Sequence, residues 1–210
     1  MSNSTVITQV ESRGDPAGAE RLLIIIPAYN EEESLGRVIR KVRAAVPGAD
    51  VVVINDGSTD ATPEIAEGYG AILVSLPYNL GIGSAMQTGF MFARDNYYQI
   101  AIQVDGDGQH DPAEIPELLA ALRESKADVV IGSRYLEDRG YITPKLRRMG
   151  IVILAAIISA ITGQRITDPT SGFRALNRRA IDFSAVEYPF DYPEPESVVT
   201  FKRAGLRIVE

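Results

Sequence analysis

Short apolar runs alternate with amphipathic segments along most of the chain. Runs with the length and composition of buried strands lie at 22–26, 51–54, 71–74, 100–102, 127–131 and 206–209. Helical spacing of apolar residues, or a helix-start signal, predicts helices at 28–46, from about 63, and at 79–92, 111–125 and 192–204. This alternation predicts an α/β fold with a Rossmann-like, mostly parallel central sheet and helices on both faces.

Polar residues gather directly after the predicted strands. Tyr29 follows the first strand, Asp56 the second, Asp105 and Asp107 the fourth, and Arg134 the fifth. Ligands of open α/β sheets bind at the carboxyl ends of the strands. These residues, distant in sequence, are therefore expected to meet in one crevice.

The segment after the fourth strand is the richest in candidate chemistry. Asp105, Asp107 and Gln109 alternate along it, and Gly106 and Gly108 let the backbone approach closely. Oxygen ligands of this kind suit Mg²⁺ or Mn²⁺. A cation held by only two or three protein oxygens keeps coordination positions open for the phosphates of a nucleotide.

Three residues each have a functional and a structural interpretation, and a fourth is assigned mainly to structure. Asp56 either contacts a base or ribose or stabilises its own turn. Gly83, at a helix start, either helps to present backbone N–H groups to an anion or permits close helix packing. His110 is either a metal ligand or a hydrogen-bonded loop residue, whereas Asp111 is assigned mainly to capping the next helix.

Composition limits the remaining classes of protein. The 210 residues are 45% hydrophobic and contain no cysteine, which predicts one globular domain at 21–210 and excludes disulfides and thiolate chemistry. Residues 1–20 are polar, lack the apolar stretch of a secretory signal and are expected to form a flexible tail. A net charge of −7 argues against a nucleic-acid partner.

The charge is distributed unevenly along the sequence. Residues 134–179 contain nine basic and three acidic residues, so this part carries +6 and the remainder −13. An anionic group is expected near the basic part, although a solvated surface is the alternative. Within it, 149–162 carries no charge and is too short to cross a bilayer. It is either a buried helix or an interfacial helix whose basic neighbours contact lipid headgroups.

Three further carboxylates are candidate bases. Asp168 stands between basic residues and should remain ionised, either as a general base or as a buried ion-pair partner. Glu194 and Glu196 begin the last predicted helix, where complementarity to the helix dipole is a sufficient structural explanation.

Five motifs taken together resemble the family-2 glycosyltransferases of GT-A fold, and most closely the bacterial and dolichyl-phosphate-sugar synthase-like branch. They lie at 27–32, 55–60, 105–110, 132–135 and 168–174. The resemblance implies inverting transfer of a sugar from a nucleoside diphosphate donor, such as a UDP- or GDP-sugar. It also implies Mn²⁺ or Mg²⁺ as cofactor and a polyprenyl-phosphate or glycan acceptor.

The resemblance also assigns roles to residues of this chain. It implies a nucleotide-sugar site formed by Pro27, Ala28, Tyr29, Glu31, Asp56, Gly83, Asp105, Gly106 and Asp107. The implied metal ligands are Asp105, Asp107 and Gln109, and the implied catalytic residues are Arg134, Asp168, Glu194 and Glu196. A lipid-phosphate acceptor is already an anion that needs no base, and it would be held by Arg134, Arg147 and Arg148.

Two departures from the family pattern leave the donor open. Asn55 replaces the first Asp of the usual Asp-Asp-Gly-Ser, and Ile82 stands where a lysine is common. The alternatives are a nucleotidyltransferase that makes sugar nucleotides and a catalytically silent sugar-nucleotide-binding subunit. The expected location is cytoplasmic, with peripheral membrane contact through 145–165. An oligomer is compatible with the sequence, and the final strand at the chain end suggests a truncated C-terminus.

Overall fold

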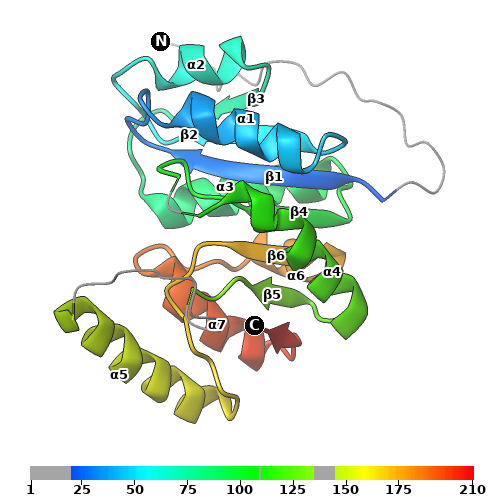
Figure 1. Ribbon diagram of the computed structural model, residues 1–210, viewed down its shortest axis with the longest axis vertical. Coiled ribbons are helices and arrows are strands. Elements are labelled where there is room, and N and C mark those ends of the chain that lie inside the picture. Colours follow the sequence, from blue (N-terminus) through cyan, green and yellow to red (C-terminus); the bar gives the residue numbers. More distant parts are fainter. Residues whose placement is uncertain (1–19, 109, 135–144) are drawn as a thin grey trace.

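The computed structural model describes residues 20–108, 110–134 and 145–210, which form a seven-stranded sheet between two layers of helices (Figure 1). The strands are β1 (Leu22–Ala28), β2 (Asp50–Asn55), β3 (Ile72–Ser75), β4 (Ile100–Gln103), β5 (Val129–Ile131), β6 (Arg174–Asn177) and β7 (Ile208–Val209). Their spatial order is β3-β2-β1-β4-β6-β5-β7. The predicted α/β class is confirmed.

The sheet is parallel apart from one strand. Parallel pairing joins β1 to β2 and β4, β2 to β3, and β5 to β7. Strand β6 runs antiparallel between β4 and β5, and Arg174 pairs with both Gln103 and Ile131. Strand β6 therefore begins at the edge where β4 and β5 end. The turn that leads into it lies at the same edge as the loops after the parallel strands.

The helices lie on both faces of the sheet, as predicted. They are α1 (Leu35–Ala45), α2 (Thr62–Gly68), α3 (Ile82–Asp95), α4 (Ile115–Ser125), α5 (Lys145–Thr162), α6 (Arg178–Ser184) and α7 (Pro193–Arg203), with a 3₁₀ turn η1 at Pro112–Glu114. Alternate residues of β1 point to opposite faces of the sheet. Leu23 and Ile25 pack in the core with α3, α6 and α7, whereas Ile24 and Ile26 pack in the core with α1, α2 and α4.

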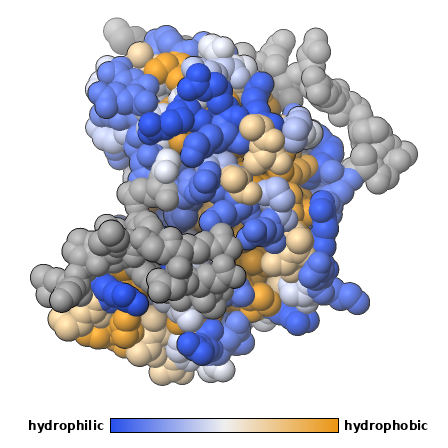
Figure 2. All heavy atoms as spheres, in the orientation of Figure 1, coloured by the Kyte–Doolittle hydropathy of each residue, from blue (hydrophilic) through white to orange (hydrophobic). Residues whose placement is uncertain are grey.

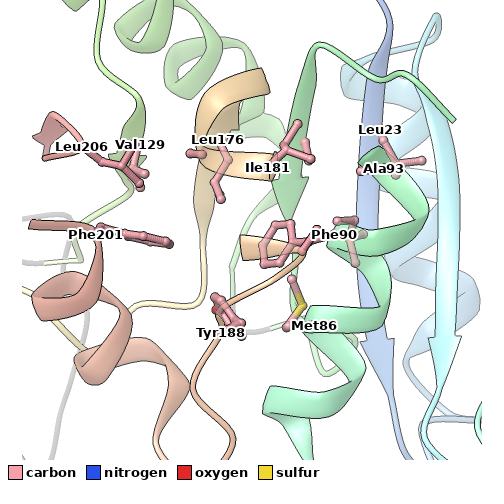
Figure 3. Close-up of a cluster of buried hydrophobic side chains, with 14 of the residues drawn as sticks. Leu23, Met86, Phe90, Ala93, Val129, Leu176, Ile181, Tyr188, Phe201 and Leu206 are labelled. Atoms are coloured by element: carbon pink, nitrogen blue, oxygen red, sulfur yellow. The ribbon is translucent and has the colours of Figure 1, made fainter. Parts of the chain in front are cut away.

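The first of these cores joins the two ends of the sheet. Figure 3 shows Phe90 and Met86 of α3 beside Tyr188, with Ile181 of α6 and Phe201 of α7 reaching the same cluster. The rings of Phe90 and Tyr188 lie 5.1 Å apart. This packing holds the C-terminal elements against the parallel strands, so the loops at one sheet edge are fixed relative to one another.

Several local expectations differ from the structure. The first helix begins at Leu35, because residues 32–34 form the preceding turn. The sequence did not predict β6 or α6, because β6 has only four residues and begins with a buried arginine instead of an apolar run. The predicted cap at Asp111 is confirmed, since its carboxylate accepts a hydrogen bond from the Ala113 amide.

Helix α5 is half buried. Ile151, Ala155 and Ile158 face the protein, and α5 packs against α7. Its other face is apolar and exposed, and it comprises Met149, Val152, Ile153, Ala156, Ile157, Ala160 and Ile161. Figure 2 shows apolar atoms where α5 lies at the lower left of Figure 1. A fully buried helix was therefore the wrong alternative. Within the described residues, we find no helix that is long and apolar enough to span a membrane.

Candidate active site

A pocket of about 410 Å³ opens at the carboxyl edge of the sheet. It is lined by Pro27, Ala28, Tyr29, Glu31, Asp56, Asn79, Gly81, Ile82, Ala85, Asp105, Gly106, Asp107 and Glu194. Residues from the loops after β1, β2, β3 and β4 thus meet the start of α7, as the sequence predicted for most of them. A larger cavity of about 690 Å³ lies at the opposite edge, beside Ile100 and Asn177, away from the predicted site residues.

The loops after β1 and β2 hold each other in place. The Asn30 amide donates to Ser58 Oγ at 3.0 Å, and Asn30 Oδ1 accepts from the Thr59 amide at 2.9 Å. The Glu31 amide donates to Thr62 Oγ1 at 2.8 Å. Side chains thereby satisfy backbone groups of the neighbouring loop. The Pro27–Glu31 wall of the pocket is consequently held in one shape.

Asp56 organises a third loop. Its carboxylate is buried and accepts hydrogen bonds from the amides of Leu80 (2.7 Å) and Gly81 (2.9 Å). Each carboxylate oxygen has further lone pairs, so this does not preclude the predicted contact to a base or ribose. The position of Asp56 in the pocket wall agrees with that prediction, and its structural partners show a second role.

Gly83 does not line this pocket. A Cβ at this position would lie 2.3 Å from the Pro189 carbonyl oxygen and 2.5 Å from Phe190 Cα. The close approach between α3 and the 189–190 segment therefore requires glycine here. The structure supports the packing interpretation of Gly83, while Gly81 and Ile82 take the place in the pocket wall that the sequence assigned to it.

Asp105 and Asp107 both reach the pocket. Asp105 Oδ1 lies 3.5 Å from Gln103 Nε2, and a Cβ on Gly172 would fall within 2.8 Å of both Asp105 oxygens. Gly172 thus leaves the space that the carboxylate occupies. Gly106 is similarly constrained, because its Cβ would lie 3.0 Å from the Pro27 carbonyl oxygen. Gln109, the third predicted metal ligand, lies outside the described residues.

Two carboxylates from one loop are a small set of protein ligands. Within the described part of the chain, no group of three or more His, Cys, Asp or Glu side chains is arranged to hold a metal. Mg²⁺ in particular is commonly bound by one or two carboxylates together with substrate phosphates and water. The residues present therefore fit a divalent cation that is shared with a nucleotide.

Arg134 and Asp168 form an ion pair, and neither residue lines this pocket. The expectation that Arg134 would meet Asp56, Asp105 and Asp107 in one crevice was therefore wrong. Arg134 Nε donates to Asp168 Oδ2 at 2.7 Å, and Nη2 donates to Oδ1 at 2.9 Å. Burial alone would raise the pKa of the Asp168 carboxyl, but the hydrogen bonds and charge of Arg134, with help from Thr170, hold that pKa below its ordinary value. Asp168 has no exposed surface. The structure therefore supports the ion-pair alternative for Asp168 over its predicted role as a general base.

Two residues that the sequence did not single out hold the turn before β6. Glu210 accepts hydrogen bonds from the amides of Thr167 (2.7 Å) and Asp168 (2.9 Å). The buried Arg174 donates to the Ser171 carbonyl at 2.8 Å and to the Glu194 carbonyl at 2.7 Å. Arg174 therefore ties this turn to the start of α7. In the sequence, the signal that could have identified Arg174 is a charged residue at the start of a strand.

Glu194 and Glu196 differ in position. Glu194 lines the pocket, whereas Glu196 is exposed and lies outside the pocket wall. Desolvation raises the pKa of the Glu194 carboxyl, the nearby Arg174 charge opposes this effect, and Asp105 adds to the rise. Of these two predicted bases, Glu194 is the one that borders the pocket. Arg148 is exposed at the start of α5, and the side chain of Arg147 lies outside the described residues.

Sequence comparison gives the class of protein to which this site belongs. The profile of glycosyl transferase family 2 matches residues 23–186. Undecaprenyl-phosphate mannosyltransferase of Micrococcus luteus is 36% identical over 204 residues, covering 90% of this chain and 81% of that protein. Polyprenol monophosphomannose synthase of Mycolicibacterium smegmatis is 33% identical over 186 residues, covering 82% and 70% of the two chains.

Solved structures share the fold. A mycobacterial protein superposes with a TM-score of 0.71 at 26% identity, covering 90% of this chain and 64% of its own. Glucosyl-3-phosphoglycerate synthase from Mycobacterium tuberculosis, in complex with Mn²⁺, UDP and glucosyl-3-phosphoglycerate, superposes with a TM-score of 0.65 at 22% identity, covering 90% and 69%. The fold and the family profile thus define a glycosyltransferase of GT-A fold. The chain belongs to glycosyl transferase family 2.

Proposed function

We propose that this enzyme transfers a sugar from a nucleoside diphosphate donor to a polyprenyl phosphate, with inversion at the anomeric carbon and with a divalent cation. The observation that carries the proposal is the pocket in which Asp56, Asp105 and Asp107 converge, in a chain whose relatives are named as polyprenyl-phosphate glycosyltransferases. Membership of family 2 favours this function over the nucleotidyltransferase alternative.

The donor occupies the pocket between the β1, β2 and β4 loops. Asp56 and the wall from Pro27 to Glu31 receive the nucleoside, and the Asp105 and Asp107 carboxylates face the diphosphate. Mn²⁺ or Mg²⁺ bound by these two carboxylates supplies positive charge that stabilises the departing diphosphate. Gly106 permits this arrangement because a larger residue would press on the Pro27 carbonyl.

Arg134 is the residue best placed to orient an anionic acceptor. Asp168 fixes the plane of its guanidinium through two hydrogen bonds, and Glu210 in turn fixes the backbone of Asp168. A pre-oriented guanidinium binds a phosphate with little loss of side-chain entropy. The phosphate oxygen is already anionic, so attack on the anomeric carbon requires no protein base.

A glycan hydroxyl is the second acceptor class, and Glu194 is the observation that favours it. Its carboxylate reaches the donor pocket and has a raised pKa, which suits a group that takes up a proton. For a hydroxyl acceptor, Glu194→Gln should reduce turnover by about 10²–10⁴-fold. For a phosphate acceptor the same change should reduce turnover by less than about tenfold, since no proton has to be removed.

We also propose that α5 contacts a membrane surface. Its exposed face is apolar, and the exposed Arg148 and Arg165 flank it at opposite ends. An apolar helix face bordered by basic residues suits the boundary between headgroups and acyl chains. A polyprenyl phosphate resides in that boundary, so this contact places the enzyme near its proposed acceptor.

The test combines donor binding with transfer. Thermal unfolding with UDP-, GDP- and dTDP-sugars, each with and without Mn²⁺, identifies the donor because a ligand that binds the native state raises the unfolding temperature. The donor found in this way is then supplied with a polyprenyl phosphate or with a soluble glycan. Transfer to the lipid phosphate alone supports the proposal. Donor binding without transfer to either acceptor would instead support the catalytically silent subunit.

A further inference from the structure

His110 is a buried side chain for which neither the fold nor the proposed transfer supplies a role. It is 8% exposed, and its ring stacks on Phe173 with centroids 5.5 Å apart and planes inclined by 16°. Neither ring nitrogen has a hydrogen-bond partner among the described residues. Leaving a buried polar group unsatisfied costs about 1–3 kcal/mol, so the arrangement points to a partner that is engaged in another state of the enzyme.

The nearest charged group is a predicted metal ligand. His110 Nδ1 lies 3.2 Å from Asp105 Oδ2, although the two groups are not aligned as a hydrogen bond. The other Asp105 oxygen lies 3.5 Å from Gln103 Nε2, and Gly172 borders both oxygens. Residues from three segments therefore surround the Asp105 carboxylate. Hydrogen bonds of catalytic groups are often long before the ligand binds and shorten in the complex.

Phe173 fixes the plane of the imidazole. Its own position depends on Gly132, since a Cβ there would lie 2.4 Å from Phe173 Cδ1. The stacked ring is also almost fully buried. Phe173 consequently packs against the face of the His110 ring, while His110 Nδ1 lies 3.2 Å from Asp105 Oδ2.

We propose that His110 is a positioning residue that orients the Asp105 carboxylate for the divalent cation by donating from Nδ1–H to Oδ2. This inference rests on the metal site of the proposed function and names a residue that supports it. Partners that hold a metal ligand from outside typically change metal affinity by about 10–100-fold when they are removed.

Three variants separate positioning from packing. In His110→Asn the side-chain amide nitrogen takes the place of Nδ1, whereas in His110→Gln it reaches the place of Nε2, and His110→Ala removes both. All three lose the stack on Phe173, so their unfolding temperatures should fall together. Mn²⁺ affinity is measured by calorimetry in the presence of UDP and, in parallel, of GDP. We expect a loss of about 10–100-fold for His110→Ala and His110→Gln. His110→Asn should remain within about threefold of the wild type.

The outcomes distinguish this inference from the proposed function. Equal Mn²⁺ affinity in His110→Asn and His110→Gln would overturn the role of Nδ1, as would wild-type affinity in His110→Ala. If His110→Ala does not fold, the comparison of His110→Asn with His110→Gln still tests the role of Nδ1. A wild-type enzyme that binds no Mn²⁺ with either nucleotide would overturn the proposed metal site, and the role of His110 with it.

Discussion

The two halves of the candidate site, the proposed donor side and the proposed acceptor side, are stabilised in different ways. On the donor side, loops after parallel strands hold one another through hydrogen bonds between side chains and backbone, as Asn30 does with Ser58 and Thr59. On the acceptor side, a buried charge pair between Arg134 and Asp168 is central, and Glu210 fixes its backbone. Neutral contacts tolerate the loss of one partner better than a buried ion pair does.

This difference follows from the topology. The donor loops each succeed a parallel strand and meet their neighbours side by side. The acceptor turn instead precedes the antiparallel strand β6, and it needs Arg174 to connect it to α7. Donor binding should therefore be sensitive to changes at the pocket surface, and acceptor positioning should be sensitive to changes in the interior.

The donor side is tested most strongly at Asp107. Asp107→Asn removes a carboxylate from the diphosphate site, so turnover should fall by about 10³-fold through loss of charge stabilisation in the transition state. Calorimetry should show that Mn²⁺-dependent nucleotide binding is abolished while the fold is retained. Asp111→Asn is the matched control, since Asp111 caps η1 outside the pocket. Unchanged nucleotide affinity in Asp107→Asn would remove the metal hypothesis.

A substitution in the ion pair of the acceptor side should lower the stability of the fold. Asp168→Asn removes the fully buried carboxylate that pairs with Arg134, which should lower the free energy of unfolding at pH 7 by about 3–5 kcal/mol. The folded pKa of Asp168 lies below its ordinary value of 3.8. The pair therefore stabilises the native state above that pH, and this contribution is lost as the pH falls through the folded pKa. The difference between variant and wild type should shrink in that acidic range.

Urea unfolding across pH measures this effect. Asp182→Asn is a suitable control because it breaks an exposed pair with Arg178, which should change the free energy of unfolding by less than about 0.5 kcal/mol. A similar loss of unfolding free energy in both variants would show that the buried pair stabilises the fold no more than the exposed pair does.

Gly172 links the two halves, and Gly172→Ala should have a smaller effect on metal binding. The added methyl would displace the Asp105 carboxylate, so Mn²⁺ affinity in the presence of nucleotide should fall by about tenfold. Gly150→Ala serves as the control, because a Cβ there meets no atom within 4 Å and replaces glycine within α5. That control should stabilise the helix by about 0.5–1 kcal/mol. Equal Mn²⁺ affinities in the two variants would contradict the close contact.

The proposed membrane contact is tested on the exposed face of α5. Ile157→Glu removes one apolar side chain from the exposed face of α5, and burial of an isoleucine contributes about 1.5–3 kcal/mol, so binding to anionic liposomes should weaken at least tenfold. Val186→Glu, a change at another exposed apolar residue, before α7, should leave sedimentation with liposomes unaltered. Equal loss in both variants would indicate a nonspecific charge effect, contrary to the role of α5.

The sequence predicted the parallel part of the molecule well, because its strands are apolar runs that each end in a polar cluster. Asp56, Asp105 and Asp107 were all placed correctly in one pocket. The acceptor side was harder to predict. Strand β6 is short and starts with Arg174, whose charge is satisfied only by groups that the fold brings together. Likewise, two interpretations of Asp168 were open until Arg134 was seen to occupy both of its oxygens.

The insertion of β6 between β4 and β5 sets the distance between these two strands. Neighbouring strands lie about 4.8 Å apart, so the ends of β4 and β5 are separated by roughly 10 Å at the level of the sheet. Asp105 and Arg134 follow these ends in the adjoining loops. That interval is built into the backbone and does not depend on which donor is bound. For the proposed reaction, the sheet sets a fixed spacing between the loops that would bind the diphosphate and the acceptor anion. Selection among sugars of similar length must then come from the side chains that line the gap.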